Sequence, residues 1–220
     1  MFDTNALDQF DRDGALQETR EKAGVTRASL LKRAAIGGGA AIGGGAILAG
    51  TAAAAPGKTQ DIAILNFALT LEYLEEAFYS DVQKNGFLKG NLATFAEVAG
   101  RDEARHRIFL VKALGTKAIK KPVFDFGAAT QGRTAFINTA IALEDTGVSA
   151  YAGQGPRLFD KKVVAAALSI HSVEARHAAW IRQLSGKTGR QGSPAPVPFD
   201  VSRSMAQVLA IVKGTGFIVG

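Results

Sequence analysis

The sequence predicts an all-α protein, a four-helix bundle with a long crossover between helices 2 and 3, plus a short C-terminal helix. Apolar residues recur at three- and four-residue spacing through four long segments, which is the period of a helix with one buried face. The connections between these segments are short, long and short, as in two helical hairpins joined by a crossover. Ala and Gly are abundant and aromatic residues make up 8% of the chain, a balance that favours close-packed helices over a β-sandwich.

Local signals place the boundaries of each element. Thr59 is a predicted N-cap of the first helix, and the Asn-Gly pair that ends at Gly86 is its predicted stop. Pro122 and two glycines mark the segment from Lys120 to Gly132 as the crossover loop, and a Gly/Pro/Ser-rich linker covers 186–198. The predicted helices are 59–84, 91–114, 132–152, 161–184 and a final short helix at 202–212.

The two predicted hairpins carry the same residues at matching positions. The string Glu-Ala-Arg-His occurs at 103–106 and again at 174–177. The preceding helix of each hairpin holds a Leu-Glu pair, which ends at Glu72 or Glu144, with a tyrosine seven residues later. Because both hairpins also have nearly the same spacing between the lone Glu and the string, one half of the bundle is predicted to superpose on the other.

These repeated residues are predicted to be a set of metal ligands. Glu and His three positions apart lie on one face of a helix, about a turn from each other, so they can hold one metal while the carboxylate bridges to a second. Four carboxylates balance the charge of two divalent cations, and oxygen and nitrogen ligands without sulfur favour iron or manganese. The predicted ligands of two Fe or Mn ions are Glu72, Glu103, His106, Glu144, Glu174 and His177. A bundle that keeps these residues as buried hydrogen-bonded pairs is the structural alternative.

Four further side chains belong to the predicted neighbourhood of the site. His171 is three residues before Glu174, so it projects from the same helix face as an extra ligand, a proton donor behind the ligands or a core histidine. Glu75 follows Glu72 by three positions and could approach the metals. Tyr79 and Tyr151 could donate hydrogen bonds to ligands, be oxidised near the metals, or simply pack in the core. No catalytic residue beyond the metal site is assigned.

The sequence resembles the ferritin-like superfamily, and within it the exported bacterial branch related to plant desiccation-related proteins. The resemblance covers about 58–213 and rests on Leu-Asn-Phe-Ala-Leu-x-Leu-Glu-Tyr-Leu-Glu at 65–75, the two Glu-Ala-Arg-His strings, the crossover, Phe-Asp at 199–200 and Val-Leu-Ala at 208–210. It implies one Glu from each of two helices and Glu-x-x-His from each of the other two, around two iron or manganese ions.

The first 55 residues are predicted to be a leader and export signal, followed by the bundle at 56–190 and the linker and C-terminal helix at 191–220. A basic flank, an uncharged Gly/Ala-rich stretch and a run of alanines before Pro56 are typical of an export signal. The flank resembles a twin-arginine signal, although Ala28 stands where the second arginine belongs. We therefore expect a periplasmic or other extracytoplasmic protein; a retained membrane anchor is the alternative.

Composition limits the functions. The chain has no cysteine, which excludes disulfides, thiolate metal sites and a rubredoxin-like electron donor of its own. The net charge is +6, and the basic residues are scattered rather than gathered in a run with interleaved aromatics. This pattern favours a solvated basic face over a nucleic-acid surface.

Three hypotheses of function follow. The first is an oxidoreductase that acts on peroxide, O₂ or Fe(II) in stress protection, with a small-molecule oxidant or metal ion as its partner and an external electron donor where the reaction is reductive. The second is a non-catalytic metal-binding or desiccation-protective protein. The third is a metal-free interaction module. A homodimer is one assembly left open.

Overall fold

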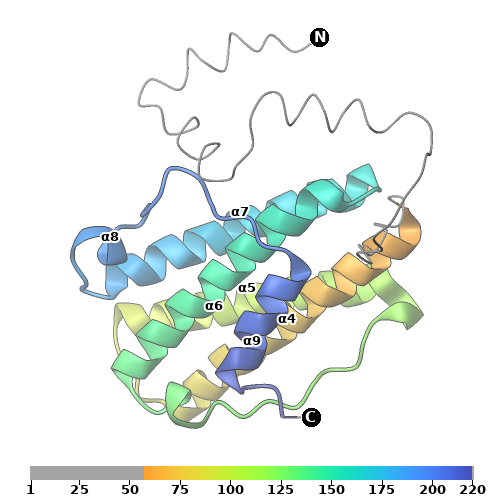
Figure 1. The fold of residues 1–220 in the computed structure, drawn as a ribbon. Coiled ribbons are helices and arrows are strands. Elements are labelled where there is room, and N and C mark those ends of the chain that lie inside the picture. The colour runs from red at the N-terminus through yellow and green to blue at the C-terminus, as the bar shows by residue number, and fades with distance from the viewer. Residues whose placement is uncertain (1–56, 220) are drawn as a thin grey trace, which may run out of the picture. The chain divides into compact units, whose positions relative to one another are not determined.

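The computed structural model describes residues 57–219, and this part of the chain is built from helices, as the sequence predicts (Figure 1). The described α-helices are α4 (Lys58–Asn85), α5 (Asn91–Leu114), α6 (Arg133–Gln154), α7 (Lys161–Leu184), α8 (Gly189–Gly192) and α9 (Met205–Thr215). Short 3-10 turns lie at η1 (Gly115–Lys117), η2 (Gly127–Thr130) and η3 (Gly155–Arg157).

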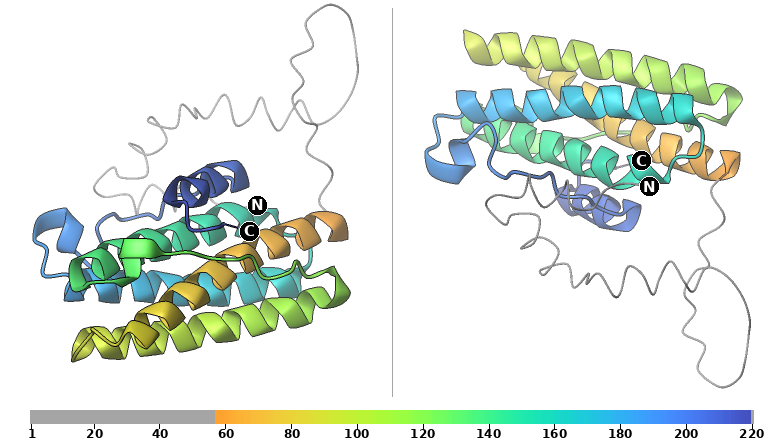
Figure 2. Two further views of the ribbon diagram at one scale, coloured as in Figure 1. Left: turned by 90° about the horizontal axis from the view of Figure 1, so that it is seen from below. Right: turned by 90° about the horizontal axis from the view of Figure 1, so that it is seen from above.

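The four long helices form the predicted bundle of two hairpins. Helices α4 and α5 pair along their length, and so do α6 and α7. Residues 115–132 are the crossover that carries the chain from the first hairpin to the second (Figure 1). The final helix α9 lies on the α6 side of the bundle, on the opposite side from α5 (Figure 2).

Most helix boundaries match the sequence signals, and the differences have local causes. Gly86 ends α4 in the left-handed conformation (φ 64°) that glycine adopts without steric penalty. The prediction of Thr59 as the N-cap is wrong: Gly57 holds that position, and no side chain caps the helix. Helix α9 begins three residues later than predicted, because Ser204 and Gln207 form a capping box at its start. The four-residue α8 within the linker was not predicted.

The apolar core is divided into two clusters along the bundle axis. On α5, the buried residues of one cluster include Leu92, Phe95 and Ala99, whereas Leu110 and Leu114 belong to the other. On α7, Ile181 lies in the first cluster, whereas the second contains Ala167 and Ile170. The polar strings at 103–106 and 174–177 lie between these sets of residues. The metal-ligand candidates thus form a polar layer between two apolar clusters.

The crossover is held against the C-terminal tail. Phe124 forms an antiparallel bridge with Ile218, supported by hydrogen bonds from Asp125 N to Phe217 O (2.9 Å) and from Val219 N to Val123 O (2.9 Å). Val208 of α9 is also completely buried in the first apolar cluster. Packing of the C-terminal segment therefore fixes the long connection that joins the hairpins.

The predicted leader at 1–55 lies outside the described residues. Among the described helices, none combines the length and the apolar character that a membrane crossing requires.

Gly153 of α6 should be intolerant of any side chain. A Cβ added there would lie 1.9 Å from the backbone oxygen of Arg203, so Gly153→Ala must displace the segment that leads into α9. We expect this variant to lose about 1–3 kcal/mol of unfolding free energy, measured by denaturant titration with circular dichroism. Gly214→Ala in α9 is the matched control, because its Cβ would meet no atom within 4 Å. Equal stability of the two variants would contradict this packing.

Candidate metal centre

All six predicted ligands converge in the middle of the bundle. Each of the four long helices contributes its carboxylate to this cluster, and all four carboxylates are completely buried. The imidazole of His177 is 4% exposed and that of His106 is 11% exposed. The cluster exists because the three-residue spacing in α5 and α7 places Glu and His one turn apart on the inward face of each helix. The members are Glu72 (α4), Glu103 and His106 (α5), Glu144 (α6), and Glu174 and His177 (α7).

The cluster contains two overlapping sets of four residues that could each hold a metal ion. One ligand atom from every member of a set lies within 4.8 Å of the others. Glu103 and Glu174 belong to both sets, whereas each set adds one lone Glu and one His of its own. The first set is Glu72, Glu103, His106 and Glu174; the second is Glu103, Glu144, Glu174 and His177.

The two sets do not coincide with the two halves of the sequence repeat. His106 Nδ1 lies 3.0 Å from Glu103 Oε2 in its own string but also 3.2 Å from Glu174 Oε1 of the other string. His177 Nδ1 lies 3.0 Å from Glu103 Oε1 and 3.5 Å from Glu144 Oε2. Each set contains one complete half of the repeat and adds the string carboxylate of the other half, so Glu103 and Glu174 are common to both sets. This sharing agrees with the bridging carboxylates that the sequence predicts.

Several buried polar atoms of the cluster have no hydrogen-bond partner among the described residues. A buried polar atom without a partner is costly, so native proteins rarely keep many of them together. Cations would satisfy these atoms with the ligand chemistry that carboxylates and imidazoles provide. The residues present thus fit metal ions. The unpaired atoms of the six ligand candidates are Glu72 Oε2, Glu103 Oε1, Glu144 Oε2, both oxygens of Glu174, and His177 Nδ1.

The electrostatics of the metal-free cluster are dominated by burial. Desolvation raises the pKa of Glu72 to about 8, partly offset by the nearby His106, and it raises the pKa values of Glu144 and Glu174 as well. Burial also acts on Glu103, yet the two neighbouring imidazoles bring its pKa down to about 2. Although burial opposes it, the neighbouring carboxylates Glu103 and Glu144 raise the pKa of His177 to about 11. The metal-free centre therefore stores protons that metal binding must release.

The two tyrosines join the halves of the repeat by hydrogen bonds. The Tyr151 hydroxyl donates a 2.5 Å hydrogen bond to Glu72 Oε1, and the Tyr79 hydroxyl donates one to Glu144 Oε1. Each tyrosine is buried and reaches the lone Glu of the opposite hairpin. Of the roles considered from the sequence, hydrogen bonding to ligand candidates is therefore the one that the geometry displays.

Asp102 is a contributor that the sequence reasoning missed. Its Oδ2 lies 3.5 Å from Nε2 of His177, on the far side of the ring from the cluster. A carboxylate in this position orients a histidine ligand and makes it more basic. The sequence did contain a signal for this role. An aspartate precedes the first Glu-Ala-Arg-His string, whereas the apolar Val173 precedes the second, so the two halves differ at this position.

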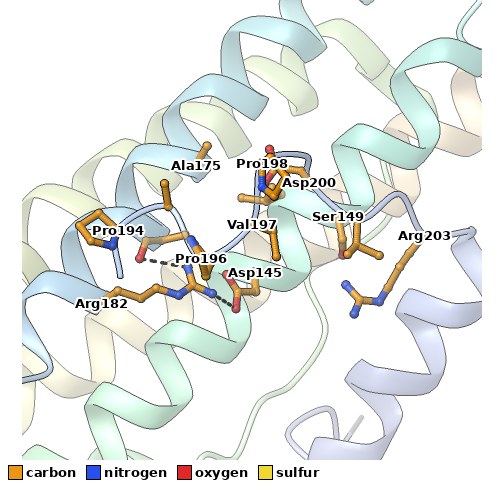
Figure 3. Close-up of a pocket in the computed structure, with 14 residues that line it drawn as sticks. Asp145, Ser149, Ala175, Arg182, Pro194, Pro196, Val197, Pro198, Asp200 and Arg203 are labelled. Atoms are coloured by element: carbon orange, nitrogen blue, oxygen red, sulfur yellow. Dashed lines mark hydrogen bonds and ion pairs between the residues drawn. The ribbon is translucent and has the colours of Figure 1, made fainter. Parts of the chain in front are cut away.

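His171 faces away from the cluster. Its Nε2 lies 3.8 Å from Asp200 Oδ2, and it belongs to neither of the two ligand sets. Asp200 lines a surface pocket of about 470 Å³ between α6, α7 and the proline-rich segment 194–203, where Arg182 is paired with Asp145 (Figure 3). None of the six ligand candidates is among the residues that line this pocket. Of the roles considered for His171, the extra-ligand role is the one that this geometry disfavours.

Residues 60–187 match the family model of the ferritin-like domain. The chain belongs to this family. The match spans more than half of the chain and includes all six ligand candidates together with both tyrosines. No curated protein sequence matches the chain. The family and the buried cluster together support metal binding, and neither names the ion or an activity.

The metal-free protein should become less stable as the pH rises. Glu72 has a folded-state pKa of about 8 against an ordinary value of 4.5, so its contribution to stability is full below pH 4.5 and is lost as the pH rises through 8. His177 acts in the same direction, from 6.5 to about 11, and Glu103 acts in the opposite direction only in acid, between 4.5 and 2.

We therefore expect the Tm of chelator-treated protein to fall between about pH 5 and pH 9, measured by thermal melts across buffers of equal ionic strength. Metal-loaded protein is the control, since its ionised carboxylates are paired with cations and its Tm should change less. A metal-free Tm that rises over this range would contradict the proton storage.

Asp102→Asn should weaken metal binding without unfolding the bundle. The amide no longer provides the negative charge that supports His177, and loss of such a partner lowers metal affinity about 10- to 100-fold. Isothermal titration with Mn²⁺ or Zn²⁺ measures the change. Asp81→Asn on α4 is a charge-matched control, because Asp81 pairs with Thr130 rather than with the cluster. The same affinity in Asp102→Asn and wild-type protein would show that Asp102 does not support the ligand.

Proposed function

We propose that this protein holds a carboxylate-bridged pair of iron or manganese ions and acts as an oxidoreductase on peroxide, O₂ or Fe(II) in stress protection. The observation that carries the proposal is the convergence of four completely buried carboxylates and two imidazoles, whose inward-facing atoms are largely unpaired. Oxygen and nitrogen ligands of this kind suit iron and manganese, which change oxidation state.

The geometry supports distinct roles for the ligands. Glu103 and Glu174 belong to both sets and would bridge the two ions. Glu72 and His106 would complete one ion, and Glu144 and His177 the other. Two iron or manganese ions held by these residues would supply electron-transfer chemistry toward peroxide, O₂ or Fe(II).

The surrounding chain would orient these ligands and keep water away. Tyr79 and Tyr151 hold one oxygen each of Glu144 and Glu72 by hydrogen bonds, which leaves the second oxygen of each carboxylate for a metal. Asp102, 3.5 Å from Nε2 of His177, would orient this ring from the side away from the cluster. The completely buried Phe95 packs edge-on against His177, with ring centroids 6.4 Å apart. These contacts would preorganise the ligands so that metal binding requires little rearrangement.

The source of electrons would lie outside the chain. Because the sequence has no cysteine, it cannot build an iron–sulfur donor of its own. An external donor would serve a reductive reaction, whereas peroxide disproportionation would need none. Export by the degenerate twin-arginine signal at 1–55 would place this chemistry in the periplasm or another extracytoplasmic space.

Non-catalytic metal binding in desiccation or stress protection is the second candidate. The observation that favours it is the complete burial of all four carboxylates, which restricts the approach of a substrate. The two candidates differ in turnover. Two tightly bound ions with negligible consumption of peroxide, or of Fe(II) with O₂, would favour the second.

Elemental analysis of protein purified from its native host is the first test. Two iron or manganese ions per chain are expected, and absence of any transition metal would reject both candidates in favour of a metal-free interaction module.

Removal of a shared carboxylate should abolish the centre. Glu103→Ala and Glu174→Ala each take a ligand from both ions, so we expect metal content well below two per chain and loss of peroxide or Fe(II) consumption. Circular dichroism should show unchanged helicity, because removal of a buried carboxylate relieves repulsion in the metal-free bundle. Glu97→Ala, an exposed position on α5, is the matched control. Full metal content in either cluster variant would contradict the bridging role.

A further inference from the structure

The two halves of the centre differ at one inward position. When α4 is aligned with α6, Glu72 corresponds to Glu144 and Tyr79 to Tyr151, so Glu75 corresponds to Gly147. The first half therefore carries a second carboxylate one turn beyond its lone Glu, and the second half carries no side chain at all. The twofold pattern of four carboxylates and two imidazoles leaves Glu75 unexplained.

Glu75 is buried in the centre and lacks a complete set of partners. Its side chain is 2% exposed, and Oε1 has no hydrogen-bond partner among the described residues. Burial, together with the negative charges of Glu174, Glu103, Glu144 and Glu72, raises its pKa well above the ordinary value. The neighbouring Glu76 is different, because it forms ion pairs with Arg107 at 2.8 Å and with Lys121 at 3.7 Å.

Gly147 makes room for Glu174, and Glu75 reaches the same part of α6. A Cβ at this position would lie 2.8 Å from Glu174 Oε2 and 3.5 Å from Glu75 Oε1. Oxygens of Glu75 and Glu174 therefore both approach the same bare stretch of α6. Glu75 itself belongs to neither ligand set, but Glu174 belongs to both. Glu75 therefore lies next to a carboxylate that the two ions would share.

We propose that Glu75 is a fifth metal-binding carboxylate, which makes the two ion positions unequal and selects a metal pair with a total charge above +4. This inference rests on the proposed dinuclear centre and deepens it. Four carboxylates balance two divalent ions, so a fifth in a water-poor interior leaves one negative charge over. A pair that contains one trivalent ion removes the excess. The centre thus favours metals that reach the trivalent state, such as iron and manganese, over zinc.

Glu75→Gln in the full-length chain tests this selection, because it keeps the shape of the side chain and removes its charge. Metal retention is measured by elemental analysis after dialysis against a chelator, with oxidised iron and with zinc in parallel. We expect Glu75→Gln to lose oxidised iron about tenfold more readily than wild-type protein, with zinc retention little changed. The reduction potential of the bound iron pair should rise in the variant.

Glu76→Gln is the matched control, with the same substitution one residue away, and it should behave as the wild type. Equal retention of oxidised iron by Glu75→Gln and wild-type protein would overturn the inference, and so would an equal loss of iron and zinc. Glu75→Asp separates direct binding from charge, because aspartate keeps the negative charge but its side chain is shorter by one methylene group. Loss of oxidised iron in Glu75→Asp supports direct binding, and full retention overturns it. If wild-type protein binds neither metal, the dinuclear proposal itself fails. If wild-type protein binds metal and the Glu75 variants retain it equally well, this inference alone fails.

Discussion

Burial of several carboxylates in one layer of the bundle is the constraint on which the rest of this structure depends. Glu72, Glu103, Glu144 and Glu174 are completely buried between two apolar clusters, where ionised carboxylates repel one another and lose their hydration. In the metal-free protein, protons on the carboxyls and on the two imidazoles offset this repulsion. Cations offset it without protons, so folding, proton uptake and metal binding are linked at one set of atoms.

Contacts within each hairpin and between the two hairpins position the residues of this layer. The hairpins place Glu and His of each string one turn apart, and Tyr79 and Tyr151 then join each lone Glu to the opposite hairpin. Because both ligand sets need Glu103 and Glu174, neither half of the repeat forms a complete set alone. The long crossover is in turn fixed by the C-terminal tail, through the bridge between Phe124 and Ile218. Segments far from the centre therefore contribute to its geometry.

Departures from the internal symmetry distinguish this centre from a simple duplicate. Asp102 stands behind His177, whereas the repeat has Val173 at the matching position. Glu75 faces the cluster, whereas the repeat has Gly147. Asp102 lies against His177, and Glu75 lies near the shared Glu174. In the proposed dinuclear centre, the two ion positions would therefore differ in charge and in ligand basicity. His171, the asymmetry that is most visible in the sequence, instead lies near Asp200.

The sequence by itself determined the helices, their order, the crossover and the identity of six converging side chains, because helical periodicity and a repeated string are local patterns. It could not determine how the residues of one string contact those of the other, since these contacts depend on how the hairpins pack. Tertiary structure alone turned His171 away and brought Asp102 to His177. These outcomes are distances between residues far apart in the chain, and a single sequence carries no direct record of such distances.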